Sequence, residues 1–273
     1  MKRAALLVSL VGLALFGSAC QQDSENGASG ADPSLKRLKK AGVLRWGTDV
    51  VGGIPYVYED PQHPGSYIGF EMDLAQALAR ELGVELRLEV RAWDTLIPEL
   101  QRGSFDMAMN GIEDTAERSR MVLFSRPYFV YSQQLTVRKA TNGVDALDDL
   151  VGKRVATLSG TAAEDILRGT EGIEVVTNPE IIYSYRDLEA GKVEAVLLDT
   201  PIAAAYGAAN PALQNVGESF GEGRYVIAFR QEDVALRTAV DEALDRMRQS
   251  GELRAIYSKW GIFDQHQTQI GIL

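Results

Sequence analysis

Between residues 70 and 90 the spacing of the apolar residues changes from four to two, and this change strongly limits the fold. Over residues 70–82, leucine recurs at every fourth position with charges between, and Gly83 closes this amphipathic helix. Over residues 84–90, valine and leucine alternate with charged residues, which is typical of a half-buried strand. A helix that leads directly into such a strand predicts an α/β fold.

The same alternation of strand and helix continues along the chain. We predict helices at 35–41, 70–82, 95–102, 162–168, 182–190, 234–249 and 252–260, and strands at 43–47, 84–90, 105–109, 154–158, 173–176, 193–198 and 225–230. Ser34 is expected to cap the first helix. The order β-α-β-α-β occurs twice, so the sequence predicts two α/β lobes. Met107 and Met109 are expected in the core, and His63, in a turn-rich loop, at the surface.

Composition excludes several classes of function. The 273 residues are 45% apolar, as in soluble globular proteins. The formal net charge is −10, from 38 acidic and 28 basic residues without a basic stripe, which argues against nucleic-acid binding. The single cysteine, Cys20, excludes an intrachain disulfide framework, and two histidines leave no Cys/His zinc cluster. We therefore expect no metal and no cofactor.

The N-terminus is typical of an exported protein. Lys2 and Arg3 precede an apolar run at 4–16, which is too short to span a membrane and predicts a signal peptide at 1–19. The stretch 15–20 ends in Cys20 and resembles a bacterial lipobox, although glycine stands three residues before the cysteine where leucine is usual. The resemblance implies lipidation of Cys20, with 20–33 as a flexible tether. The alternative is a plain signal peptide with a chance cysteine. We expect an extracytoplasmic lipoprotein, in the periplasm or at the cell surface, anchored to a membrane.

Polar residues follow the predicted strands at four places where a ligand could bind. They are Asp49, Gly111, the run 159–162 and Asp199. Ligands of open α/β sheets bind beyond the carboxyl ends of the strands, and helix N-termini attract anions. Arg118 lies shortly after Gly111, and a guanidinium can hold a carboxylate through two parallel hydrogen bonds. Asp199 would suit an ammonium group. Together these residues predict a site for a zwitterion.

The order of several motifs resembles a known family. The resemblance rests on residues 69–75, 93–100, 105–112, 115–118, 124–128, 149–155, 159–161, 193–201 and 256–261. These runs are similar to the polar amino-acid-binding branch of the bacterial extracytoplasmic solute-binding proteins, family 3. The resemblance covers roughly residues 35 to 262, and many motifs in one order are more specific than any single motif.

The resemblance implies a type II periplasmic-binding-protein fold, in which two α/β lobes joined by two hinge crossover strands close on a ligand in the cleft. Lobe 1 would comprise 35–129 plus 226–264, and lobe 2 would comprise 133–222. The implied function is the substrate-binding component of an ABC importer for a polar amino acid. The implied partners are the amino acid and a membrane permease. We expect a monomer that binds its ligand and is not an enzyme.

The resemblance implies that four residues of this sequence contact the carboxylate of the ligand. Arg118 would hold the α-carboxylate, aided by Thr161. The backbone N–H groups of Gly111 and Ala162 would add two further donors. Glu113 departs from the family, since many relatives have Ser or Thr there, and an ionised side chain would repel a ligand carboxylate. We expect Glu113 to turn away from the site, or to pair with Arg118 when no ligand is bound.

The remaining carried-over contacts concern the rest of the ligand. Asp199 would bind the α-amino group, Trp93 would stack on the ligand side chain, and Asp49 would lie near its end. The loop 50–56 is about one residue longer than in relatives, and Tyr56 is expected to replace an aromatic wall that they have. The sequence does not name the amino acid.

Each assignment has an alternative. Arg118 could be a surface arginine paired with Glu117 or Asp114, Asp199 could cap the following helix, and Trp93 could be a core residue.

Two other functions are also open. A prephenate-type dehydratase on the same fold would use Glu113 or Glu164 as its general acid. A solute sensor would need an attached membrane or kinase segment.

Overall fold

The structure is a computed structural model that describes residue 1, residues 32–51 and residues 53–273. The predicted signal peptide, Cys20 and most of the predicted tether lie outside the described residues. In the part that is described, no helix is long and apolar enough to cross a membrane.

The first lobe is built around a five-stranded sheet in the order β4-β1-β5-β12-β6. Its strands are β1 (Val43–Thr48), β4 (Glu85–Val90), β5 (Met107–Ala108), β6 (Leu123–Phe124) and β12 (Ala228–Phe229). Its helices are α1 (Ser34–Ala41), α2 (Phe70–Glu81), α3 (Leu96–Gln101), α7 (Val234–Ser250) and α8 (Glu252–Lys259), with short 3₁₀ turns at Trp93–Thr95 and Arg118–Arg120. β1 runs parallel to β4 and β5, as two β-α-β units require. A small hairpin of β2 (Tyr58–Glu59) and β3 (Tyr67–Ile68) projects from this lobe.

The second lobe is built around a sheet in the order β11-β7-β10-β8-β9. Its strands are β7 (Phe129–Arg138), β8 (Arg154–Leu158), β9 (Glu174–Asn178), β10 (Ala195–Asp199) and β11 (Leu213–Tyr225). Helices α4 (Ala162–Gly169), α5 (Ile181–Glu189) and α6 (Thr200–Ile202) accompany it, with a 3₁₀ turn at Leu147–Leu150 and a π-helical turn at Ala203–Ala208. A 3₁₀ turn near the C-terminus, Gln265–Ile270, packs on the start of β7, where the Gln267 side chain bonds the backbone of Val130. β8 is parallel to β9 and β10, whereas β7 is antiparallel to β10 and β11.

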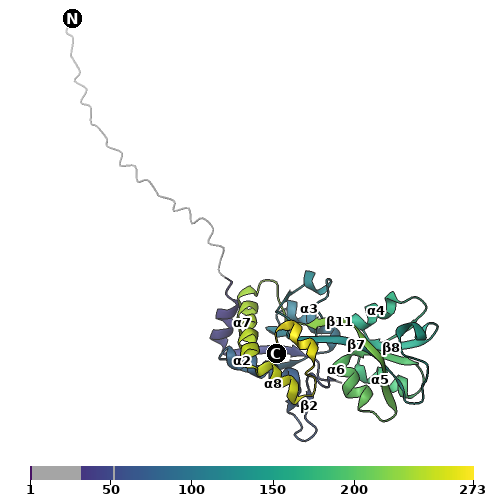
Figure 1. Cartoon of the computed structure of the whole chain (residues 1–273). Helices are drawn as coiled ribbons and strands as arrows, with labels where there is room; N and C mark the ends of the chain where they lie inside the picture. The colour runs from purple at the N-terminus through teal and green to yellow at the C-terminus, as the bar shows by residue number, and fades with distance from the viewer. Residues whose placement is uncertain (2–31, 52) are drawn as a thin grey trace. The chain divides into compact units, whose positions relative to one another are not determined.

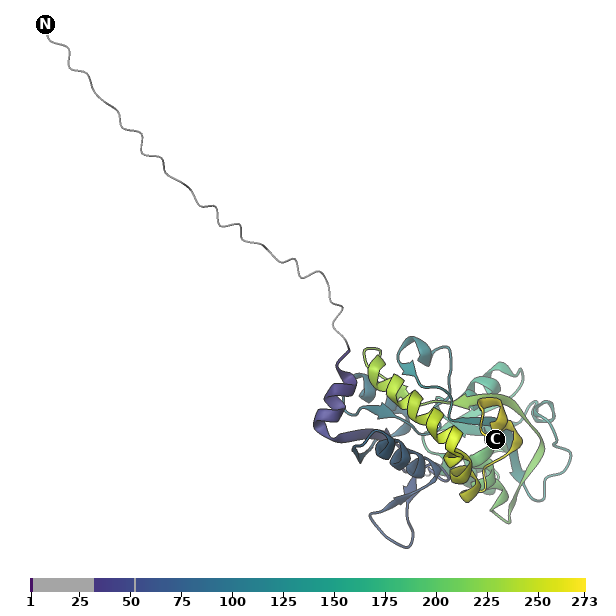
Figure 2. The ribbon, with the colours of Figure 1, turned by 60° about the vertical axis from the view of Figure 1, so that its left-hand side comes forward.

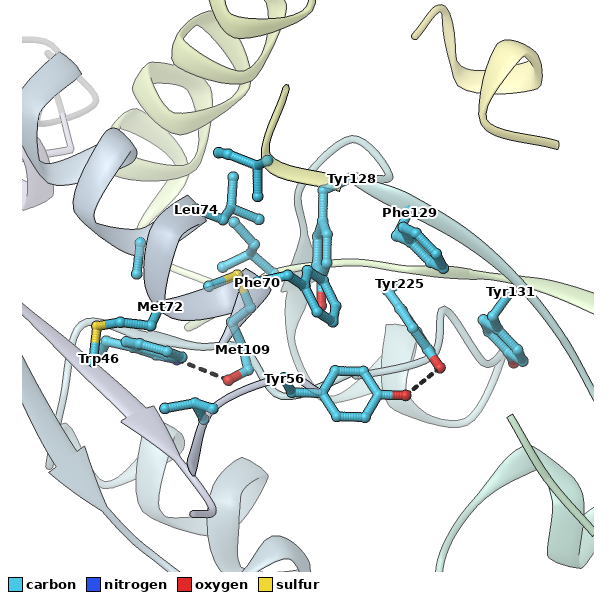
Figure 3. Packing of buried hydrophobic residues seen from close by; sticks show 14 of the residues in the cluster. Trp46, Tyr56, Phe70, Met72, Leu74, Met109, Tyr128, Phe129, Tyr131 and Tyr225 are labelled. Atoms are coloured by element: carbon cyan, nitrogen blue, oxygen red, sulfur yellow. Dashed lines mark hydrogen bonds between the residues drawn. The ribbon is translucent and has the colours of Figure 1, made fainter. Parts of the chain in front are cut away.

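β7 and β11 carry the chain between the two lobes, side by side (Figure 1). Phe129 pairs with Tyr225 and Tyr131 pairs with Gly223 in this antiparallel ribbon. The rings of Tyr131 and Tyr225 stack with centroids 4.5 Å apart (Figure 3). A Cβ at Gly223 would lie 2.4 Å from the Tyr131 hydroxyl oxygen, so only glycine fits opposite this ring. The crossing is therefore a packed aromatic ribbon.

Most of the predicted elements are confirmed. The predicted strand at 154–158 matches β8, and the predicted helices at 70–82, 162–168 and 234–249 match α2, α4 and α7 within one residue. Met107 and Met109 are fully buried and His63 is exposed, as expected.

Three local predictions are wrong. Ser34 does not cap α1 but is its first residue, because its hydroxyl accepts from the backbone N–H of Leu236 and ties α1 to the start of α7. Figure 2 shows the purple first helix beside the yellow-green α7. The predicted strand at 225–230 is broken, because Tyr225 ends β11 in one sheet and β12 starts at Ala228 in the other. Of the strand predicted at 105–109, only Met107–Ala108 (β5) is a strand in the structure.

Candidate functional site

A small cavity, called here the inner cavity, lies between the two sheets. The lining residues come from both lobes and are Asp49, Val51, Gly53, Tyr56, Trp93, Asn110, Gly111, Glu113, Leu158, Thr161, Pro179, Glu180, Ile181, Leu198, Asp199 and Ile202. The volume that the centre of a water molecule can occupy in this cavity is about 30 Å³. One bound water needs roughly 10 to 15 Å³ by the same measure. The ends of β1, β5, β8 and β10 all contribute, as open α/β sheets do at a binding crevice.

Asp199 ends β10 in the floor of the inner cavity and is 6% exposed. One carboxylate oxygen accepts from Gln133 Nε2 at 2.7 Å, and the other accepts from the Tyr225 hydroxyl. Burial, together with the nearby charge of Glu113, raises the pKa of Asp199 to about 7. Asp199 stands at the N-cap position of α6, but its side chain makes no capping hydrogen bond there, so capping does not account for its carboxylate.

Asp49 and Trp93 are joined at the first lobe's edge of the inner cavity. Asp49 follows β1, and its two oxygens accept from the backbone N–H of Val51 at 2.7 Å and of Trp93 at 3.1 Å. Burial raises the pKa of the Asp49 carboxyl above its usual range. Trp93 Nε1 donates to the Ser159 carbonyl of the second lobe at 3.1 Å. Asp49 therefore positions Trp93, and Trp93 reaches across between the lobes.

Arg118 is paired inside the cleft and not at the surface. Its guanidinium donates to the Glu113 side chain, to the Glu113 carbonyl at 3.1 Å and to the Gly160 carbonyl of the second lobe at 2.7 Å. The alternative of a surface pair with Glu117 or Asp114 is therefore wrong. The guanidinium also lies 5.4 Å from the Trp93 ring centre, within cation–π range.

Glu113 adopts one of its two expected arrangements, the pair with Arg118. It is 2% exposed. Its second carboxylate oxygen accepts from the backbone N–H of Ala162, at the N-terminus of α4, at 3.0 Å. A protein carboxylate thus bridges a cation of the first lobe and a helix N-terminus of the second.

The other predicted carboxylate donors have partners within the protein. The N–H of Gly111 donates to Glu71 Oε1 at 2.7 Å. The hydroxyl of Thr161 donates to the Leu158 carbonyl at 2.8 Å and caps α4 by accepting from Glu164 N. Although these groups already have partners, Gly111 and Thr161 both line the inner cavity.

Tyr56 forms an aromatic wall of the inner cavity, where sequence reasoning expected it. Its hydroxyl lies 2.7 Å from that of Tyr225, at the base of the crossing ribbon (Figure 3). Gly111 has φ of +64°, and a Cβ there would lie 2.9 Å from the Tyr56 ring. Glycine at 111 therefore lets the tyrosine pack against the backbone.

A larger space, called the outer hollow, lies on the other side of Trp93. Its volume by the same measure is about 350 Å³. Trp93 and Thr161 line both spaces, whereas Arg118 lines only the outer hollow. Trp93, Thr161 and the pair of Glu113, which lines the inner cavity, with Arg118, which lines the outer hollow, therefore separate the two spaces.

Sequence reasoning missed three residues that shape the site. Gln133 and Tyr225 bind Asp199 from the crossing strands. Glu71 is fully buried in the first turn of α2 and accepts from Gly111 N and the Tyr128 hydroxyl, and burial raises its pKa to about 8. Glu71 could not be found from the helix period, because an acid in the first turn of a helix is ordinarily solvated. Gln133 and Tyr225 lie on strands β7 and β11, and their contact with Asp199 joins segments distant in sequence. Over the described residues, no three His, Cys, Asp or Glu side chains form a group that could hold a metal ion.

Comparison with known proteins identifies the family. Residues 44–263 match the bacterial extracellular solute-binding proteins, family 3, and the chain belongs to this family. The L-cystine-binding protein TcyJ of Escherichia coli (strain K12) is 32% identical over 229 residues, which cover 83% of this chain and 85% of that protein. The putative ABC transporter arginine-binding protein 2 of the same bacterium is 30% identical over 200 residues, covering 71% and 81%.

Solved structures agree with this assignment. Holo ArgBP from T. maritima superposes with a TM-score of 0.74 at 33% identity, covering 82% of this chain and 98% of that one. The ancestral amino acid-binding protein AncCDT-1, a precursor of cyclohexadienyl dehydratase, gives a TM-score of 0.77 at 33% identity, covering 83% and 99%. The predicted fold class, two α/β lobes joined by two crossover strands with a cleft between them, is confirmed.

Proposed function

We propose that this chain is the extracytoplasmic substrate-binding component of an ABC importer and binds a polar amino acid, as a zwitterion, between its two lobes by hinge closure. The observation that carries the proposal is the cavity between two lobes, lined by the buried Asp199. A buried carboxylate held by two neutral donors keeps a site for an ammonium ion. The family and the relatives named as amino-acid-binding proteins support the same solute class.

The predicted ligand contacts are kept as part of this proposal. Asp199 binds the amino group, Trp93 and Tyr56 enclose the ligand body, and Asp49 lies near its far end. Arg118, Thr161, Ala162 and Gly111 form the end at which a carboxylate binds. Closure uses the paired β7 and β11 as the hinge, and we propose the lobe boundaries 35–129 plus 226–264 and 133–222.

A thermal-shift screen of the full chain against the twenty amino acids, their amines and small dicarboxylates tests the function. A ligand at 100 times its Kd adds about 2.7 kcal/mol of apparent stability, or roughly 5 to 10 °C in Tm for a chain of this size. A shift with one or a few amino-bearing solutes supports the proposal. No shift with any of them contradicts it.

We propose binding and not catalysis. Of the two general-acid candidates, Glu113 is held by Arg118 and Ala162, and Glu164 does not line the inner cavity. AncCDT-1 is a precursor of a dehydratase, so the same screen includes prephenate. Consumption of prephenate would favour a dehydratase over a binding protein.

The remaining proposals concern location and partners. We propose that Cys20 is lipidated, that the protein is anchored outside the cytoplasm, and that it works as a monomer with a membrane permease. A Cys20→Ser variant should then leave the membrane fraction and lose incorporation of labelled fatty acid. Retention of both would contradict the anchor. A dimer in sedimentation analysis would contradict the monomer.

A further inference from the structure

A hollow lined with arginines lies at the end of the first sheet that is remote from the cleft. β1 begins there at Val43, and Asp49, just after its other end, lines the inner cavity. The hollow, called here the arginine hollow, has a volume of about 520 Å³ open to the centre of a water molecule. It is lined by Ser34, Arg37, Leu38, Ala41, Val43, Arg45, Arg87, Gly103, Asp106, Arg230 and Leu236. Four of these eleven residues are arginines, in a chain with a formal net charge of −10.

Two of the arginines lie side by side on neighbouring strands. Arg45 of β1 and Arg87 of β4 are register partners, and like charges that share one face of a sheet repel each other. Arg45 donates to both carboxylate oxygens of Asp106. The side chain of Arg87 is exposed and makes no hydrogen bond or ion pair with any described residue. An anion in the hollow would therefore supply a partner that Arg87 lacks.

Helix α1, purple at the edge of the first lobe in Figure 2, extends the positive charge along the surface. It contains no acid, and its four basic residues are all exposed: Lys36, Arg37, Lys39 and Lys40. Lys36 and Arg37 lie in the first turn, where the positive end of a helix disfavours cations. Lys36 and Lys40 are four positions apart, a spacing at which like charges also repel. These charges do not stabilise α1, so they indicate a negative partner outside the helix.

Acidic residues balance only part of this basic cluster, which we define as the arginine hollow together with α1. Asp233 is fully buried and is shared by Arg37 and Arg230. Glu232 lies 3.8 Å from Arg230, and Asp106 is held by the arginine of β1. The remaining four cations form no ion pair within the described part of the chain: Lys36, Lys39, Lys40 and Arg87. The cluster therefore carries an excess of positive charge.

The chain leads from the proposed lipid anchor directly to this cluster. Cys20 to Pro33 are 14 residues. A chain of that length spans at most about 50 Å. The next residue, Ser34, lines the arginine hollow. Clusters of Lys and Arg close to a membrane anchor attract anionic lipids, and a guanidinium binds a phosphate through two parallel hydrogen bonds.

We propose that the basic cluster binds the phosphate headgroups of anionic phospholipids in the membrane that holds the anchor. This inference rests on the proposed anchor at Cys20 and goes beyond it, because it gives the folded body its own contact with the membrane. The hollow and the inner cavity lie at opposite ends of β1, so lipid bound at one end leaves the amino-acid site at the other end free.

Lysine labelling in the presence of vesicles tests the inference. The full chain is acetylated with vesicles of phosphatidylcholine alone or with one third phosphatidylglycerol, and each lysine is read by mass spectrometry. With phosphatidylglycerol, Lys36 and Lys40 should react at least about threefold more slowly, and high salt should abolish the difference. Lys153, exposed on the second lobe, is the internal control and should react equally with both vesicles. Equal reaction of Lys36 and Lys40 with both vesicles would overturn the inference.

Two matched triple variants separate this cluster from the net charge of the chain. The first replaces three unpaired cations of the cluster: Lys36→Gln, Lys40→Gln and Arg87→Gln. The second replaces three exposed, unpaired cations of the second lobe: Lys139→Gln, Lys153→Gln and Arg186→Gln. In vesicle sedimentation, the first should weaken binding to phosphatidylglycerol vesicles by at least about tenfold, and the second by less than about threefold. Equal weakening by both would overturn the inference.

Two further measurements identify the partner and keep this inference apart from the proposed function. Soluble glycerol phosphate that protects Lys36 and Lys40 as well as the vesicles do would overturn the membrane as the partner. Both triple variants should bind amino acids as the parent does, because no substituted residue lines the inner cavity. The vesicle tests need no lipid on Cys20, so their failure is distinct from a failure of the anchor, which fatty-acid incorporation reports.

Discussion

Replacing Glu71 with glutamine should change how the stability of the protein depends on pH. Glu71 is fully buried in α2, beneath the site. Its Oε1 accepts from Gly111 and Tyr128, and its Oε2 has no hydrogen-bond partner among the described residues. Desolvation of the ionised carboxyl raises its pKa from 4.5 to about 8. Glutamine preserves the shape and the Oε1 acceptor but cannot ionise.

The sign follows from the two pKa values. Between about pH 4.5 and pH 8 the folded protein keeps a proton on Glu71 that the unfolded chain releases, so this group's contribution is present at low pH and is lost as the pH rises. At about 1.4 kcal/mol per pH unit, the loss between pH 5 and pH 8 is roughly 3 to 4 kcal/mol. The free energy of unfolding of Glu71→Gln minus that of the wild type should therefore rise by this amount.

Urea denaturation followed by tryptophan fluorescence at several pH values between 5 and 9 measures this difference. Glu81→Gln is the matched control, because it lies on the same helix but is partly exposed and pairs with Arg246. Its difference from the wild type should change by less than about 1 kcal/mol, the range of exposed pairs. A difference for Glu71→Gln that is constant with pH would show that Glu71 is not buried as a neutral acid, and the reasoning would be refuted.

Three other substitutions test the site. Asp199→Asn should weaken binding of amines by about 2 to 5 kcal/mol, measured by calorimetry, because it removes the buried charge facing the ammonium; equal losses for carboxylates that lack an amine would contradict this. Trp93→Phe removes the hydrogen bond to Ser159 across the lobes, so ligand affinity should fall by about 0.5 to 1.5 kcal/mol, and unchanged affinity would contradict its role in closure. Gly111→Ala should lower Tm by about 2 to 8 °C, because a left-handed alanine costs about 1 to 2 kcal/mol and its Cβ meets the Tyr56 ring; an equal Tm in calorimetric scans would refute this.

The sequence predicted the elements whose burial is periodic. α2 buries one side of a helix and β4 alternates between partly buried and more exposed residues, so spacings of four and two were visible in the sequence. The strand ends were predictable for the same reason, and Asp49 and Asp199 indeed line the cavity. β7 was not predicted as a long strand, because eight of its ten residues are buried and leave no period to read.

The partners of the site residues could not be read from spacing. Glu113 and Ala162 lie 49 positions apart in the sequence and in different lobes, so the hydrogen bond between them depends on how the two lobes pack together. The sequence analysis left Glu113 two arrangements, since its chemistry suits both solvent and a nearby arginine. Only the three-dimensional placement of α4 selects between them.

The site and the hinge share residues, and this explains why the missed contacts cluster where they do. Asp199 on β10 is held by Gln133 of β7 and by Tyr225 of β11, the two strands that cross between the lobes. Tyr225 also binds Tyr56 and pairs with Phe129 in the ribbon. Asp199, which we propose receives the amino group of the ligand, is thus hydrogen-bonded to both strands that cross between the lobes. Because each of these bonds joins segments distant in sequence, a local pattern can locate the cavity but cannot connect it to the hinge.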